Sequence, residues 1–123
     1  MKWALIIDKR NLFRQLLALV LKWNTVLEEI VEVNSLAEAR QALANSNRKP
    51  DLAIVELDRT DEGGFELIRE LRMMVPDVPM VAISMRGAAE QHDGALRAGA
   101  DDVLTMSAHP KEIVDVVKRL IGE

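Results

Sequence analysis

Four side chains that could take part in chemistry stand at or just after the ends of short apolar runs: Asp8, Glu56, Ser84 and Met106. In open α/β sheets, ligands bind in the crevice outside the carboxyl ends of the strands. If the runs are parallel strands, these side chains surround one such crevice, where carboxylates can bind a hard cation. Polar residues also end strands simply to meet solvent and cap the next helix, so both interpretations are open.

The acidic side chains near this edge favour a weak cation site at most. Asp58 follows Glu56 by two residues, so Asp8, Glu56 and Asp58 are the candidate ligands. Lys9 lies directly beside Asp8, and its ammonium group cannot ligate a metal and would repel one. We therefore expect Mg²⁺ binding to be weak or absent, and Asp58 is more simply a solvated surface residue.

The alternation of apolar runs and helical patterns predicts the elements that position these residues. Helical periodicity separates the runs, as at Leu12 and Leu16, and a parallel connection needs such a helix. We expect a (βα)5 fold: a doubly wound, five-stranded parallel sheet in a flavodoxin-like three-layer sandwich, forming a single domain over residues 1–123. Trp3 and Trp23 are interpreted as packing residues. The expected strands are 3–8, 29–33, 51–56, 79–84 and 101–106.

Composition and charge narrow the class of protein. With 123 residues, of which 49% are hydrophobic and 29% charged, the chain suits one globular domain. Its 16 basic and 20 acidic side chains give a net charge of −4, which disfavours direct contact with nucleic acid because that affinity depends on neutralising phosphates. The apolar run that ends at Asp8 is too short for a signal peptide or a membrane span. We expect a cytoplasmic protein without membrane contact.

The motifs of common enzymes are missing from the sequence. It contains no GxGxxG after a strand, no P-loop and no nucleophile elbow, so dinucleotide binding and acyl transfer lack their glycines or nucleophile. His92 and His109 have no partner at ligand spacing, and we assign them neither a metal nor a catalytic role. The sequence therefore favours a protein that is not an enzyme.

The whole chain resembles a bacterial response-regulator receiver domain. The resemblance is carried by LIIDKRNLFRQLL, PDLAIVELDRTDEGGFELIREL, VPMVAIS and RAGADDVLTMSAHPKEIVDVVKRL, in the family's order and spacing. It implies that an acidic pair after the first strand and an aspartate after the third bind Mg²⁺. It also implies that the third-strand aspartate accepts a phosphoryl group from a histidine kinase.

The positions that correspond to this site carry different residues here. Asp8 matches the first acid of the pair, but Lys9 stands in place of the second. Glu56 occupies the phosphoacceptor position, where its extra methylene moves the carboxylate outward by about 1.5 Å and disturbs in-line transfer. We therefore expect no acyl phosphate to form at Glu56.

The switch positions are altered in part. Ser84 matches the family's switch hydroxyl, which reports the phosphoryl group, whereas Val103 stands where an aromatic side chain often changes rotamer with it. Met106 replaces the lysine that clamps a phosphoryl oxygen, and it has no charge. The resemblance with these departures indicates an atypical, degenerate receiver, or pseudo-receiver.

Two interpretations of Glu56 are open. In one, Glu56 permanently imitates the phosphorylated state by reaching toward the Ser84 hydroxyl, while Lys9 supplies the positive charge that Mg²⁺ would bring. In the other, Lys9 points to solvent and Glu56 is hydrated at the rim of the crevice.

Three functions are compatible with the sequence. The favoured one is a phosphorylation-independent signalling module that binds a protein partner or itself. The alternatives are a conventional phosphorelay receiver with an altered pocket and a small-ligand sensor that uses the crevice. The end of the chain also resembles receivers that precede a DNA-binding domain, so a longer protein that contained it would regulate transcription.

The expected interaction face is formed by the helix within 88–99, the strand at 101–106 and the last helix. In the resembling family this face carries dimerisation or effector contact, so a homodimer is one expectation. The same composition also fits a solvated helix face. The residues expected on it carry mixed charges suited to reciprocal pairs: Arg97, Asp101, Asp102, Lys111, Asp115, Lys118 and Arg119.

Overall fold

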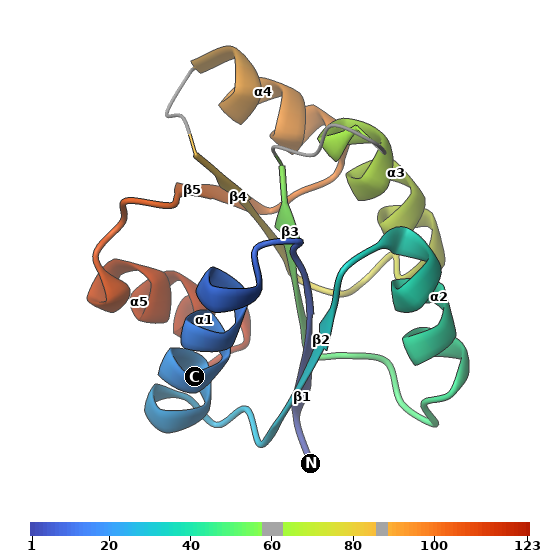
Figure 1. Ribbon diagram of the computed structural model, residues 1–123, viewed down its shortest axis with the longest axis vertical. Helices are drawn as coiled ribbons and strands as arrows, with labels where there is room; N and C mark the ends of the chain where they lie inside the picture. Colours follow the sequence, from blue (N-terminus) through green and yellow to red (C-terminus); the bar gives the residue numbers. More distant parts are fainter. Residues whose placement is uncertain (58–62, 86–88) are drawn as a thin grey trace.

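The computed structural model of the protein describes residues 1–57, 63–85 and 89–123. Within these residues five strands alternate with five helices, and the sheet lies between two layers of helices (Figure 1). The predicted (βα)5 fold is therefore confirmed. The strands are β1 (Trp3–Ile7), β2 (Glu29–Val33), β3 (Leu52–Glu56), β4 (Met80–Ser84) and β5 (Asp102–Thr105). The helices are α1 (Asn11–Asn24), α2 (Leu36–Ala44), α3 (Gly64–Met74), α4 (Ala89–Ala98) and α5 (Pro110–Leu120).

The sheet is parallel throughout, with the strand order β2, β1, β3, β4, β5. Helices α1 and α5 cover one face, and α2, α3 and α4 cover the other (Figure 1). Side chains along each strand alternate between the two cores: Ala4 and Ile6 of β1 pack on one side, and Leu5 and Ile7 pack on the other. This is the doubly wound arrangement that near-continuous apolar strands predict.

The registers of the parallel strands bring their carboxyl ends to one edge of the sheet. Ile7 lies opposite Val55, so Asp8 and Glu56 stand at the ends of β1 and β3. Strand β4 ends at the same edge with Ser84. Residues that are far apart in the sequence therefore meet at this edge.

Helix α1 has an outer face that is unusually apolar. Trp3 is buried, as expected, but Trp23 is 82% exposed, so the expectation that Trp23 is a packing residue is wrong. Leu12 and Leu16 are exposed as well. The apolar period of this segment is helical, but part of it faces away from the sheet. The buried residues of α1 are Arg14, Leu17, Ala18 and Leu21.

Two glycines permit close approaches around α3. Gly64 begins this helix, and a Cβ atom at that position would lie 2.0 Å from the backbone oxygen of Leu57. Gly94 lies within α4, where a Cβ atom would lie 2.5 Å from Cζ of Phe65. The glycine that lowers the helix propensity of α4 thus makes room for the Phe65 ring of α3.

Candidate functional site

Three polar side chains at the carboxyl edge of the sheet are buried. The exposed fractions of Asp8, Glu56 and Ser84 are 2%, 5% and 1%. Buried carboxylates need a compensating charge or hydrogen bonds, because an unpaired charge is costly to remove from water. Glu56 is not hydrated at the rim of a crevice, so this part of the second interpretation is wrong, whereas the Lys9 side chain is exposed, as that interpretation expects.

Arg10 supplies the compensating charge. Its Nε and Nη2 atoms donate to Asp8 Oδ1 and Oδ2 at 3.0 and 2.8 Å, which is a two-point contact between guanidinium and carboxylate. The same Nε atom lies 3.3 Å from Glu56 Oε2. One guanidinium therefore binds both carboxylates, and charge-assisted contacts of this kind are about twice as strong as neutral hydrogen bonds.

Lys9 contributes to the cluster through its backbone. Its N–H donates to Glu56 Oε1 at 2.9 Å, so each oxygen of Glu56 faces a donor. The expectation that the Lys9 ammonium group supplies the charge beside Glu56 is therefore corrected, because that charge comes from the next residue, Arg10.

A tight turn explains the position of Arg10. Its backbone N–H donates to Asp8 Oδ1 at 2.8 Å, a turn in which an aspartate side chain binds the backbone two residues later. This turn brings the Arg10 side chain back over the strand ends before α1 begins. The order Asp8, Lys9, Arg10 contains the signal for this turn. The sequence pointed to Lys9 because it is adjacent to Asp8, and the role of Arg10 was not predicted.

Met106 and Phe13 complete the surroundings of the guanidinium. Met106 Sδ accepts a hydrogen bond from Arg10 Nη1, and Arg10 Cζ lies 4.7 Å from the centroid of the Phe13 ring. The Arg10 side chain is only 20% exposed. Contact with an aromatic face and a soft sulfur suits a weakly hydrated guanidinium, and Met106 adds no second positive charge.

The Ser84 hydroxyl faces α4. The hydroxyl group donates a hydrogen bond to Gln91 Oε1 at 2.8 Å. The expectation that the Ser84 hydroxyl is the partner of Glu56 is therefore corrected. Met106 N–H donates to Ser84 O at 2.7 Å, and this contact joins the ends of β4 and β5. Val103 is half-buried and packs against the core beneath α2, α3 and α4. Asp58 lies outside the described residues.

A second arginine, which the sequence pattern did not indicate, fixes the backbone beneath the cluster. Arg14 lies on the buried face of α1, and its Nη1 atom donates to the Asp8 carbonyl oxygen at 2.7 Å. The same atom donates to Asn34 Oδ1, and Nε lies 3.1 Å from Glu32 Oε1. Arg14 therefore joins α1 to the ends of β1 and β2.

Most of the charged residues of the expected interaction face form ion pairs within the chain. Asp101 pairs with Arg72 at 2.9 Å, and Asp102 pairs with Arg119 at 2.8 Å. Asp101 Oδ2 also accepts from Met80 N–H. Lys111 pairs with Asp115 at 3.0 Å and Lys118 with Glu123 at 3.5 Å, and Arg97 is exposed on α4.

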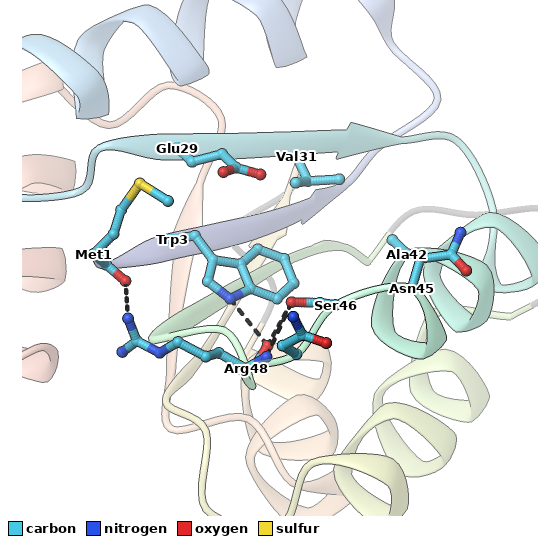
Figure 2. Close-up of a pocket in the computed structure, with 9 residues that line it drawn as sticks. Met1, Trp3, Glu29, Val31, Ala42, Asn45, Ser46 and Arg48 are labelled. Carbon is cyan, nitrogen blue, oxygen red and sulfur yellow. Dashed lines mark hydrogen bonds between the residues drawn. The ribbon is translucent and has the colours of Figure 1, made fainter.

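A cavity of about 510 Å³ opens at the opposite edge of the sheet, beside the amino ends of β1 and β2 (Figure 2). Trp3 and Val31 supply apolar walls. Polar groups in this region bind one another: Trp3 Nε1 donates to Arg48 O at 3.1 Å, and Arg48 Nη1 donates to Met1 O. The cavity is therefore separate from the carboxylates at the carboxyl edge.

Within residues 1–57, 63–85 and 89–123, no group of three or more acidic, histidine or cysteine side chains is placed to hold a metal ion. In the same part of the chain, no helix is both long enough and apolar enough to cross a membrane.

The parallel sheet, the helices on both faces and the polar cluster at the strand ends define a flavodoxin-like α/β protein. Residues 4–118 match the response regulator receiver domain family, and the chain belongs to that family. It is therefore a receiver domain of two-component signalling.

Solved structures support the same fold. A two-component response regulator from Clostridium difficile has a TM-score of 0.88 and 23% sequence identity, over 100% of this chain and 98% of that chain. The receiver domain of NtrX from Brucella abortus has a TM-score of 0.85 and 24% identity, over 97% of this chain and 98% of that chain.

Curated relatives are longer proteins. The phosphate regulon transcriptional regulatory protein PhoB of Pseudomonas aeruginosa is 27% identical, over 98% of this chain and 52% of that protein. The KDP operon transcriptional regulatory protein KdpE of Escherichia coli is 35% identical, over 83% of this chain and 43% of that protein. The chain spans about half the length of the curated relatives that it matches.

Proposed function

We propose that this receiver domain signals without phosphorylation, as a pseudo-receiver that acts through protein interaction. The observation that carries the proposal is the position of the Arg10 guanidinium between Asp8 and Glu56. In the family, these positions correspond to a carboxylate that binds Mg²⁺ and to the phosphoacceptor. Here both carboxylates bind a cation that belongs to the chain.

Competition for oxygen atoms supports this proposal. Mg²⁺ needs near-octahedral oxygen ligands at about 2.0–2.1 Å. Both oxygens of Asp8 and one oxygen of Glu56 already face Arg10, and the remaining Glu56 oxygen accepts from Lys9 N–H. A magnesium ion must therefore displace the guanidinium before it can bind these oxygens.

The chemistry of Glu56 points in the same direction. A carboxylate that accepts a phosphoryl group must reach the phosphorus atom in line, whereas Glu56 is held by two donors and is almost completely buried. Met106 offers no positive charge to a phosphoryl oxygen. We propose that Glu56 and Arg10 together hold the carboxyl edge in one fixed state, and we assign the domain no catalytic activity of its own.

The output of such a domain is the binding of another protein or a second copy. Relatives that share this domain are named as transcriptional regulators, and we propose transcription regulation for a longer protein that contains this chain, without nucleic acid contact by the domain itself. The face of α4, β5 and α5 is one candidate binding surface, but its charges already form pairs inside the chain. A cytoplasmic location also remains a prediction.

The test combines amide NMR and intact mass measurement on the unmodified protein. We expect no shift of the Asp8 and Glu56 amides on addition of Mg²⁺ and beryllofluoride, and no mass gain after treatment with acetyl phosphate. The matched control is a variant that carries Lys9→Asp, Glu56→Asp and Met106→Lys, which restore the residue types that the family uses, together with Arg10→Ala, which removes the competing guanidinium. A phosphoryl mass gain on the unmodified protein would overturn the proposal in favour of conventional phosphorelay.

A further inference from the structure

The outer face of α1 carries a stripe of four large apolar side chains. Leu12, Leu16, Leu19 and Trp23 are 70%, 53%, 54% and 82% exposed. At 100° per residue, the four positions fall within an arc of about 60°, so they form one continuous line along the helix. The stripe presents on the order of 500 Å² of apolar surface, which is near the upper end of what a monomer exposes in one patch.

The packing of α1 against the sheet does not use this stripe. The opposite face of the helix supplies the core contacts, with Leu17 and Leu21 buried between α1 and the sheet. Along α1, every residue of which is described, the exposed positions include a single charged side chain, that of Lys22. A surface helix that faces only water normally carries polar and charged residues on that side.

From these observations we infer that α1 is the interface of an antiparallel homodimer, in which the stripe of one copy packs against the same stripe of a second copy. The inference concerns the outer face of α1 and not the contacts of the Arg10 cluster, and it goes beyond the proposed lack of phosphorylation. The partner is a second copy because the stripe is complementary to itself.

The self-complementarity lies in the spacing. The intervals between the four positions are four, three and four residues, which read the same in both directions. A two-fold axis that passes between Leu16 and Leu19 therefore places Leu12 opposite Trp23 and Leu16 opposite Leu19. Alternation of four and three residues is also the spacing with which helices pack at a crossing angle of about 20°.

The helix dipoles favour the antiparallel direction over the parallel one, because opposed dipoles attract each other and aligned dipoles repel. Lys22 lies about 90° around the helix from the centre of the stripe, so it flanks the interface in either direction and does not decide between them.

The area is sufficient for a specific but modest interface. Covering the stripe in both copies removes on the order of 1,000 Å² from water, which is the lower limit for a specific protein–protein interface. The face of α4, β5 and α5 is less suited to self-association, because Asp101 and Asp102 are already paired with arginines of the same chain. We therefore expect a reversible dimer that forms at micromolar to millimolar concentration.

The first experiment is sedimentation equilibrium of the whole chain over a concentration series up to roughly 1 mM. Leu16→Glu and Leu19→Lys should each weaken self-association by at least about tenfold, because each places a charge in the centre of the stripe. Arg97→Glu, on exposed α4, is the matched control and should leave the dimer unchanged. Circular dichroism checks that the variants are folded. Both leucines are at least half exposed, so neither substitution should unfold the chain, and one folded variant is enough to test the interface.

The second experiment tests the direction of the helices. The chain has no cysteine, so engineered thiols react only with each other. A mixture of the Leu16→Cys and Leu19→Cys proteins should give the mixed disulfide in preference to either symmetric one under mild oxidation. Preferential Leu16→Cys self-crosslinking would overturn the antiparallel arrangement. A chain that stays monomeric at the highest concentration, or a dimer that Arg97→Glu breaks and Leu16→Glu does not, would overturn the interface.

Discussion

Replacement of Arg10 by alanine removes the cation from between two buried carboxylates. Loss of one partner of a buried ion pair costs about 3–5 kcal/mol, because the remaining charge is left without compensation. The Arg10 side chain is 20% exposed, so water can partly replace it, and we expect a loss of stability somewhat below that range, about 2–3 kcal/mol. Asp8 and Glu56 would then repel one another with no arginine between them.

The assay is urea denaturation of the wild type, Arg10→Ala, Glu56→Gln and the double variant. If Arg10 compensates Glu56, the alanine substitution costs less once Glu56 is neutral, and the coupling energy should be about 1–2 kcal/mol. Addition of Mg²⁺ provides a second measurement. The ion should stabilise Arg10→Ala and not the wild type, and Mg²⁺ at ten times its dissociation constant adds about 1.4 kcal/mol.

Two results would refute this reasoning. A loss of stability below about 0.5 kcal/mol, the range of ordinary surface substitutions, would show that Arg10 does not compensate the carboxylates. Equal stabilisation of the wild type and Arg10→Ala by Mg²⁺ would show that the guanidinium does not compete with a metal. Arg10→Lys is the control for charge alone, and it should recover only part of the loss because an ammonium group cannot make the two-point contact with Asp8.

Three further substitutions test the packing around the site by denaturation. Gly64→Ala should cost more than about 2 kcal/mol, because the added Cβ would meet the Leu57 backbone oxygen, and a stable variant would contradict that close approach. Arg14→Met should cost about 2–3 kcal/mol through loss of charged hydrogen bonds, and an unchanged midpoint would argue against its buried contacts. Ser84→Ala should cost about 1 kcal/mol and increase hydrogen exchange in α4, since the contact to Gln91 is lost; unaltered exchange would count against that link.

The fold could be predicted from the sequence because strand and helix patterns alternate without interruption. A parallel sheet buries both of its faces, so its strands read as continuous apolar runs, and the connecting segments have helical period. The meeting of Glu56 and Ser84 at one edge follows from strand direction alone. These are properties of the backbone, which local sequence patterns largely determine.

Side-chain partners could not be predicted in the same way. Lys9 and Arg10 are adjacent cations, and their roles depend on a turn whose geometry only the folded chain displays. In α1, the helical period was correct but did not reveal that Leu12 and Leu16 face away from the sheet. When a helix has apolar residues on two sides, its sequence does not show which side is buried. In α1 the charged Arg14 lies on the buried side.

The Arg10 contact has a consequence for how such a domain could be controlled. The Arg10 guanidinium belongs to the same chain as Asp8 and is only two residues away from it. Its effective concentration at the carboxylates therefore does not fall on dilution. A free ion or a phosphoryl donor must therefore outcompete a permanent neighbour. If the domain is held in one state, as we propose, the strength of its signal follows the number of copies present. Synthesis and degradation then take the place of modification as the points of control.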